Sequence, residues 1–451
     1  MKIIVIGCGK VGFTIAQQLN DEKHDVTVID SDYRRLSQIR DDLDVLQITG
    51  SGASVEILQE AGIEECDMVI AVTDSDELNL LCCMIARKMG HCTTIARVRN
   101  PMYNKEVELL KEALGISMII NPEQVAANAI ARLLRFPGAL DIESFSGGKA
   151  EQIKIEVKSD TKIANMSLID IGKRFKIDML ITGVQRGENV YIPNGEFVIK
   201  PGDKITIVAT PENAMLFLDK IGLNTHQVKD CIIVGGSNVA VYLARMLKDM
   251  NIDVTIIDKS EDKCSYLSEI VPHVTIVNGD ASDANILRQE GIHKVEAFVA
   301  LMNMDEENIM VSLYAAANSH AKIITKVDRL NFEDVISSLN LGSLISPKNL
   351  TAAQILRYSR AALNSVGSNI ETLYRIFDNK AEALEFIVRN DSSLVNIPLK
   401  NLRTKPNTLI ASINRNGNII IPKGDHRIFP GDHVIVVTTN KHLKDLKDIL
   451  A

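Results

Sequence analysis

Six consecutive residues near the start of the chain have the types and spacing of a phosphate-binding turn. The apolar run from Lys2 to Ile6 is followed by Gly7, Cys8, Gly9, Lys10, Val11 and Gly12, where a helix-length segment begins. In such a G-x-G-x-x-G turn the first glycine permits the tight bend, the second lets a pyrophosphate reach the backbone, and the third lets the helix pack on the strand. The exposed N–H groups and the helix dipole favour an anion there. The pattern predicts a dinucleotide site; the alternative is a turn that no longer binds a ligand.

An acidic residue stands where the second strand of such a unit should end. Asp30 follows the run from Val26 to Ile29 and is the expected acceptor for the ribose hydroxyls of the ligand. Ser31 and Asp32, and not an arginine, follow it directly, which disfavours the 2′-phosphate of NADP. We therefore expect NAD or NADH, with ATP or ADP as the alternative.

Three more polar side chains stand at the ends of neighbouring strands. Thr73 and Asp74 follow the fourth apolar run, and Arg97 ends the next. The carboxyl ends of parallel strands border the crevice where open α/β sheets hold ligands, so these residues are candidates for contact with ribose, adenine or phosphate. Alternatively, Thr73 and Asp74 form a capped loop before a helix at Asp76, and Arg97 is a solvated charge or an interdomain salt bridge.

Most of this pattern occurs a second time. The segment from Cys231 to Ala240 repeats the one from Ile3 to Gly12, an offset of 228 residues for the first glycine (235 − 7), and Asp258 repeats Asp30. The counterparts of the first turn are Gly235, Gly236, Ser237, Asn238 and Val239. Because Ser237 replaces the middle glycine, it crowds the phosphate approach. The second site is therefore expected to be weaker, differently selective or empty.

Each repeat has two parts, which predicts four domains. In residues 1–135 and 228–350, β-branched runs alternate with helix-length segments, the pattern of an α/β domain with a doubly wound parallel sheet. Residues 141–224 and 366–451 have short strands and sharp turns and are expected to be small α+β domains. The motif Pro201-Gly-Asp203 suits a type II turn, and Pro430-Gly-Asp432 repeats it. The segment Pro122 to Arg135 is predicted to be a crossing helix whose partner is another copy.

The composition excludes several classes of protein. A formal net charge of -8 gives no footprint for nucleic acid and is repelled by anionic lipid. No apolar run approaches the roughly 18 residues of a membrane span, and the start lacks the cleavage pattern of a signal peptide. The seven cysteines are scattered, so neither a disulfide framework nor a metal site is expected. We expect a cytoplasmic protein that reaches a membrane only through a protein partner.

The sequence contains no recognisable catalytic constellation. It has no Tyr-x-x-x-Lys, G-x-S-x-G, H-E-x-x-H or P-loop motif, and its nine histidines are dispersed. A dehydrogenase needs a proton-transfer group and a substrate pocket beside its cofactor domain. The partners of the first nucleotide domain here are a second such domain and two small ones. We therefore expect a sensor without catalytic residues and not an enzyme.

The whole chain resembles a tandem of RCK (KTN) units of the kind found in regulatory subunits of Trk-type potassium uptake systems. The resemblance rests on the order and duplication of the glycine turn, Ala61-Gly-Ile, Ala71-Val-Thr-Asp-Ser-Asp-Glu77, Ile95-Ala-Arg-Val-Arg99 and Phe136-Pro-Gly-Ala-Leu140. It implies a cytoplasmic, homo-oligomeric ring, docked on the inner face of the membrane beneath an integral potassium translocator and biased by nucleotide. Two departures are Gly50-Ser-Gly52, where RCK units usually carry Gly-Asp, and Ser237. The alternatives are an RCK regulator of another cation channel or exchanger and an NAD-dependent oxidoreductase.

Overall fold

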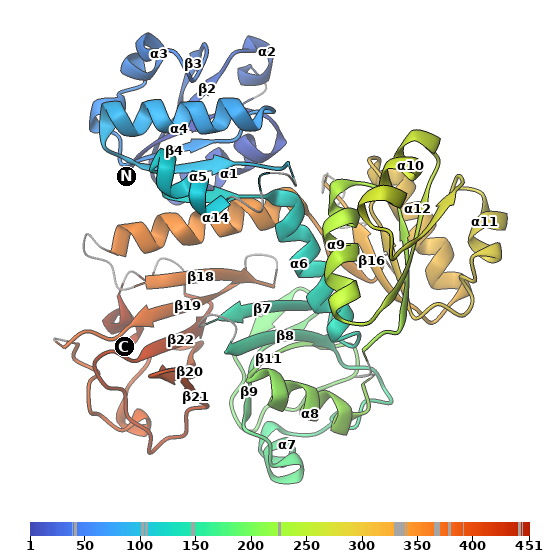
Figure 1. The fold of residues 1–451 in the computed structure, drawn as a ribbon. Helices are drawn as coiled ribbons and strands as arrows, with labels where there is room; N and C mark the ends of the chain where they lie inside the picture. Colours follow the sequence, from blue (N-terminus) through green and yellow to red (C-terminus); the bar gives the residue numbers. More distant parts are fainter. Residues whose placement is uncertain are drawn as a thin grey trace.

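The structure is a computed structural model of the 451-residue chain. It describes residues 1–37, 39, 43–100, 103, 107–145, 149–223, 227–328, 339, 341–364, 370–377, 380–390, 392–440, 443 and 445–451. The expected domain limits at residues 224 and 366 lie outside these ranges. Four units are visible in Figure 1: two lobes with parallel sheets, here the first and second lobe, and two smaller units with antiparallel sheets, the first and second module.

The first lobe is a doubly wound α/β domain. Its strands are β1 (Lys2–Ile6), β2 (Asp25–Asp30), β3 (Val45–Thr49), β4 (Met68–Ala71), β5 (Thr93–Arg97) and β6 (Met118–Ile120). Its helices are α1 (Lys10–Asp21), α2 (Tyr33–Leu36), α3 (Val55–Glu60), η1 (Ile63–Glu65), α4 (Asp76–Gly90), α5 (Val107–Leu114) and α6 (Pro122–Arg135). The strands are parallel and lie in the order β3-β2-β1-β4-β5-β6. Strands β2 and β3 are added on one side of β1 and the later ones on the other side, so the strand order reverses between β1 and β4. Ligands bind at such a reversal in open α/β sheets.

The second lobe repeats this arrangement. Its strands are β12 (Asp230–Val234), β13 (Asp253–Asp258), β14 (Thr275–Asn278), β15 (Ala297–Ala300), β16 (Lys322–Lys326) and β17 (Ser343–Ile345). Its helices are α9 (Asn238–Asp249), α10 (Glu261–Ile270), α11 (Ala284–Gln289), α12 (Asp305–Asn318) and α14 (Pro347–Asn364). The order β14-β13-β12-β15-β16-β17 matches the first sheet strand for strand. The duplication read from the sequence is therefore a duplication of fold.

The modules are small antiparallel sheets with helices. The first contains β7 (Asp141–Phe145), β8 (Ala150–Glu156), α7 (Leu168–Phe175), β9 (Met179–Arg186), β10 (Asn189–Tyr191), β11 (Lys204–Ala209) and α8 (Pro211–Ile221). The second contains β18 (Ile370–Ile376), β19 (Ala381–Ile387), η4 (Leu399–Asn401), β20 (Thr408–Arg415), β21 (Asn418–Ile420), β22 (His433–Thr438) and η5 (Leu446–Ile449). Gly202 and Gly431 have φ of 87° and 83°, as the predicted type II turns require.

Two long helices connect the repeats. Helix α6 leaves the first lobe and packs against α9 of the second, whereas α14 leaves the second lobe and packs against α1 of the first (Figure 1). The expected partner of α6, another copy of the unit, is thus the second repeat of the same chain. Each repeat therefore packs one of its helices against the other repeat, so α6 and α14 are exchanged between them.

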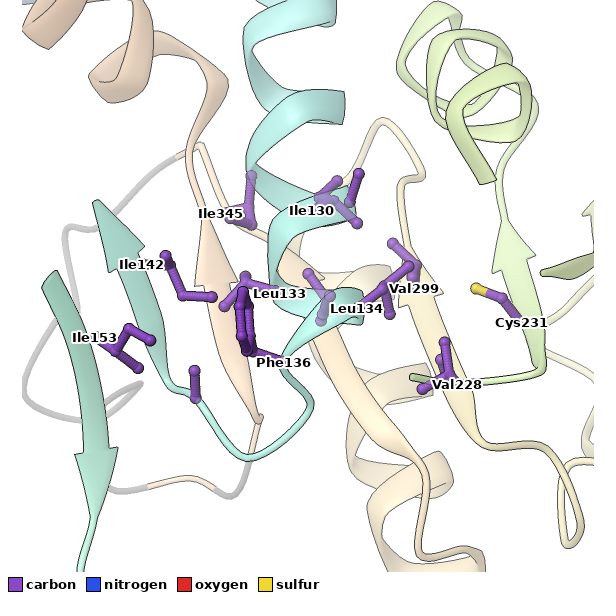
Figure 2. Close-up of a cluster of buried hydrophobic side chains, with 14 of the residues drawn as sticks. Ile130, Leu133, Leu134, Phe136, Ile142, Ile153, Val228, Cys231, Val299 and Ile345 are labelled. Atoms are coloured by element: carbon purple, nitrogen blue, oxygen red, sulfur yellow. The ribbon is translucent and has the colours of Figure 1, made fainter. Parts of the chain in front are cut away.

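The apolar face of α6 explains why this exchange is stable. Ile130, Leu133 and Leu134 are almost fully buried and belong to one continuous core that also includes Ile142 of the first module and Val299 of the second lobe. Figure 2 shows these three side chains standing between the two units. Burying an aliphatic side chain of this size is worth about 1.5–3 kcal/mol, so α6 ties three units together.

Candidate nucleotide site

The three glycines of the first turn occupy different environments. Gly7 has a φ of 100°, and its N–H donates to the carbonyl of Ile29 at 2.7 Å. A Cβ on Gly12 would lie 1.8 Å from the carbonyl oxygen of Gly7, so only glycine fits where α1 starts. A Cβ on Gly9 would have no atom of the protein within 4 Å. The middle glycine thus borders open space, while the outer two are required by the turn and by packing.

Asp30 lies directly beside this turn. Its carboxylate is 6% exposed and accepts from the N–H of Cys8 at 2.6 Å and from the N–H of Asp32 at 2.8 Å. A carboxylate has about four acceptor positions, so two remain for the hydroxyls of a ribose. Burial, and secondarily Asp30, raise the pKa of the Cys8 thiol to about 11, so this thiol is neutral at physiological pH. The carboxylate is therefore held in place by the turn it adjoins.

The predicted residues of the first lobe surround two adjoining spaces. A pocket of about 330 Å³ is lined by Gly7, Asp30, Thr73 and Asp74. A cleft of about 930 Å³ between the lobes is lined by Cys8, Gly9, Lys10, Val11, Asp74 and Arg97, and also by Ser237, Asn238 and Val239 of the second lobe. Gly12 is buried behind them. Together the two spaces have room for both halves of a dinucleotide, because ligand sites typically measure about 300–1,000 Å³.

Arg97 is a buried cation at the end of β5. It is 6% exposed, its guanidinium donates to the carbonyl of Thr73, and it lies 3.5 Å from the carboxylate of Asp74. Burial is the main cause that lowers its pKa, followed by repulsion from Arg99. The alternative of a solvated charge is wrong, and because Asp74 belongs to the same lobe this ion pair is not an interdomain one.

Thr73 and Asp74 combine a structural role with a place in the pocket. The N–H and hydroxyl of Thr73 both donate to the side-chain oxygen of Asn79 at 2.7 Å, and Ser75 caps α4 by accepting from the N–H of Leu78. The predicted capped loop before the helix at Asp76 is therefore present. The side chain of Asp74 is 72% exposed and pairs with Arg35 at 3.3 Å. Both residues also line the pocket.

Sequence reasoning missed two residues of this site. Arg35 lines both spaces and lies 3.8 Å from Asp30 and 3.3 Å from Asp74. It stands in α2, five residues after Asp30, and no pattern distinguishes it from a surface arginine. Asn79 is fully buried and joins the ends of β4 and β5 through Thr73 and the carbonyl of Arg97. Its repetition as Asn308 was the available signal, because a buried polar side chain is seldom duplicated without a structural role.

The second lobe reproduces this geometry with one obstruction. Gly235 has a φ of 97°, and Asp258 accepts from the N–H of Gly236 at 2.7 Å and from the N–H of Ser260 at 2.9 Å. Gly235, Gly236, Ser237 and Asp258 line a pocket of about 290 Å³. The hydroxyl of Ser237 is buried and has no hydrogen-bond partner within the described residues. Ser237 is the counterpart of Gly9 in the first lobe.

Charged side chains connect the lobes across the cleft. The ammonium of Lys10 lies 3.8 Å from the carboxylate of Asp328, which is also 3.9 Å from Lys326. Lys326 donates to the carbonyl of Met302 at 2.9 Å, as Arg97 does to Thr73. The two turns therefore open onto one shared cleft with cations on both sides.

Other kinds of site are not found in the described part of the chain. It holds no group of three or more side chains placed to bind a metal ion. None of the helices within the described ranges is both long and apolar enough to cross a bilayer. All seven cysteines are buried free thiols.

Comparison with protein families matches both halves of each repeat. The TrkA-N domain matches residues 3–122 and 231–347, and the TrkA-C domain matches residues 153–222 and 383–451. The Trk system potassium uptake protein TrkA homolog 1 of Methanosarcina mazei is 31% identical over 97% of both chains. The potassium uptake protein TrkA of Halomonas elongata is 30% identical over 98% of this chain and 96% of its own.

Solved structures with the same fold support the tandem arrangement. The RCK domain of GsuK covers 97% of this chain and 92% of its own with a TM-score of 0.63 and 19% identity. A structure described as the GsuK channel bound to NAD covers 97% of this chain and 77% of its own with a TM-score of 0.64 and 18% identity. At this identity the likeness establishes the fold alone. With the two family matches and the full-length relatives, it is clear that the chain belongs to the TrkA family of potassium uptake proteins, which is not a family of enzymes.

Proposed function

We propose that this chain is a cytoplasmic, nucleotide-sensing regulator that binds NAD or NADH in its first lobe and controls a Trk-type potassium translocator. The observation that carries the proposal is the open backbone at Gly9, directly beside the anchored carboxylate of Asp30. Phosphate oxygens rest against such bare main chain at the start of a helix, and the acidic residue takes the ribose. In the proposed site the phosphates lie along residues Gly7 to Gly12.

The remaining residues of the proposed site act on the two ends of the ligand. Asp30, Thr73 and Asp74 bind the adenosine half, and Arg97 and Lys10 supply positive charge toward the phosphates. ATP and ADP are competing ligands because they share the adenosine and pyrophosphate groups. The second lobe, with Gly235 to Val239 and Asp258, is proposed to bind more weakly because Ser237 stands where the first turn has Gly9.

The proposed mechanism is a shift between two arrangements of the lobes. The first site opens onto the cleft that the second lobe closes, where Lys10 faces Asp328. A nucleotide changes the balance only by its different affinity for the two arrangements. Because the exchanged helices tie both lobes to the modules, a change in the cleft is transmitted to the whole chain.

We further propose that copies of this chain assemble into a ring beneath the translocator. Supporting this, Leu81 on α4 and Met310 on α12 occupy equivalent positions and are 41% and 66% exposed. Equivalent exposed apolar side chains on both lobes suit a contact that repeats around a closed assembly.

The test is potassium flux through a Trk-type translocator reconstituted in vesicles with the purified chain. Wild-type chain should change the flux when NADH is added, and the Asp30→Asn variant should bind the translocator but no longer respond to NADH. The Asp258→Asn variant is the matched control in the second lobe and should retain the response. The proposal is contradicted if the chain does not change the flux, or if the flux responds to NADH equally with Asp30→Asn. If the chain instead binds another cation channel or exchanger in membrane extracts, that protein replaces the Trk-type translocator as the proposed partner.

A further inference from the structure

A further cleft in the described part of the chain is lined by no residue of either glycine turn. It measures about 1180 Å³ and is bounded by the two exchanged helices, α6 and α14, and by the sheet of the first module. Helix α6 directs Gln124, Asn128 and Arg132 into it, at spacings of four residues that place them on one helical face. Helix α14 contributes Asn349 and Arg357. Both exchanged helices thus turn polar side chains toward this cleft.

The charge of this cleft is opposite to that of the whole chain. Five basic and three acidic side chains line it, although the formal net charge of the chain is -8. Two of the acids are already paired, since Glu143 lies 3.9 Å from Arg357 and Glu188 lies 2.7 Å from Lys380. Lys204 on β11 has no ion-pair or hydrogen-bond partner for its ammonium group within the described residues. The basic side chains that line the cleft therefore outnumber the acidic ones that could neutralise them.

Two buried polar atoms of the cleft lack partners. The side-chain oxygen of Gln185 and the hydroxyl of Ser346 are inaccessible to solvent and form no hydrogen bond with any described group. Such atoms are rare in folded proteins and call for a water molecule or a ligand. An occupant that satisfies both the basic side chains and Gln185 needs anionic oxygens together with hydroxyl groups.

The geometry points to a second ligand site in this cleft, for a small hydroxylated organic anion that carries phosphate or carboxylate groups. Lys204 and Arg132 bind its charged groups, and its hydroxyls pair with Gln185 and Ser346 once these two side chains rotate toward the cleft that they line. The occupant touches a helix of each repeat and the first module at once. It is thus placed to stabilise one arrangement of the exchanged helices independently of the nucleotide turns.

The test is calorimetric titration of the full chain with two probes, citrate for carboxylates and glucose 6-phosphate for phosphates. We expect one probe molecule per chain and affinity about tenfold weaker in Lys204→Gln, the cost of one lost charge-assisted hydrogen bond. Arg132→Gln should weaken binding similarly and serves if the first variant fails to fold. Lys200→Gln, an exposed lysine of the same module outside the cleft, is the matched control and should bind normally.

Each outcome decides the proposal. Binding of either probe with the expected pattern supports it and identifies the anionic group. Affinity that is unchanged in Asp30→Asn separates this site from the nucleotide turn. The proposal is overturned when neither probe binds the wild type at millimolar concentration, when both lining variants bind as well as wild type, or when Lys200→Gln weakens binding as much as they do.

Discussion

At the scale of single residues, the structural roles of the outer two glycines of the first turn could be predicted from the sequence because each meets a steric need. Gly7 requires a positive φ and Gly12 leaves no room for a Cβ. The position of Arg35 could not be predicted, because it depends on how the four-residue α2 folds back over Asp30 and Asp74. Local spacing thus predicts backbone requirements, whereas charged side chains from other elements are placed only by the fold.

Glu143 is a residue whose role the sequence did not suggest. It lies on β7, 3.9 Å from Arg357, and its side chain is 26% exposed. Burial, and then repulsion from Asp141, raise its pKa to about 7, while Arg357 and Arg132 only partly offset this. A carboxyl whose pKa is raised on folding favours the folded state while it is protonated. That contribution is complete below its unfolded pKa of about 4.3 and is lost as the pH rises through 7.

We therefore predict that Glu143→Gln alters the pH dependence of stability. The variant should match wild type near pH 4 and be more stable by about 2 kcal/mol at pH 8, a value below the full linkage energy because solvent reaches the side chain. Thermal melting followed by circular dichroism between pH 4 and 8 measures the difference. Glu60→Gln, an exposed acid at the end of α3, is the control and should show no such trend. A difference for Glu143→Gln that stays constant with pH contradicts the assignment.

At the scale of elements, the strands and helices with a clear periodicity were predictable. The predicted limits of β1 and α6 coincide with the structure, and those of β2 differ by one residue at each end. Strand β6 was not predicted because three residues are too few for an alternation to be recognised. Helix α14 was not predicted either, because one of its sides carries Asn349 and Arg357 toward the polar cleft. A helix with polar groups on an inner face lacks a simple amphipathic pattern.

The exchange of α6 and α14 predicts which lobe a substitution in each helix destabilises. Ile355 belongs to α14 of the second repeat but is buried in the core of the first lobe with Ile3 and Ile15. Ile355→Ala should cost about 2–5 kcal/mol, the usual range for a buried isoleucine. Hydrogen exchange should accelerate in β1 and α1 of the first lobe, which lie more than 300 residues away in sequence.

The reciprocal variant provides the comparison. Ile130 on α6 belongs to the core that includes Val239 and Leu243 of α9, so Ile130→Ala should accelerate exchange in α9 of the second lobe. If each substitution affects only the lobe of its own repeat, the two helices are not exchanged as described.

At the scale of the whole molecule, the duplication and the four units follow from the sequence, but their arrangement does not. Repetition at a fixed offset predicts equal folds and says nothing about which repeat receives which helix. That depends on which core receives apolar side chains such as Ile130 and Ile355. One chemical difference between the equivalent turns is Gly9 in the first lobe and Ser237 in the second. We predict that this position decides which lobe binds nucleotide strongly.

The most direct test is calorimetric titration with NADH of the wild type and of the reciprocal variants Gly9→Ser and Ser237→Gly. A Cβ added at Gly9 has no atom within 4 Å apart from those of the adjoining residues, so the variant should melt as the wild type does. We predict that Gly9→Ser weakens the strong site by at least about tenfold, the loss of roughly 1.4 kcal/mol of phosphate contact, and that Ser237→Gly strengthens the weak one. Unchanged NADH affinity in Gly9→Ser would contradict the central claim that phosphates rest against the first glycine turn.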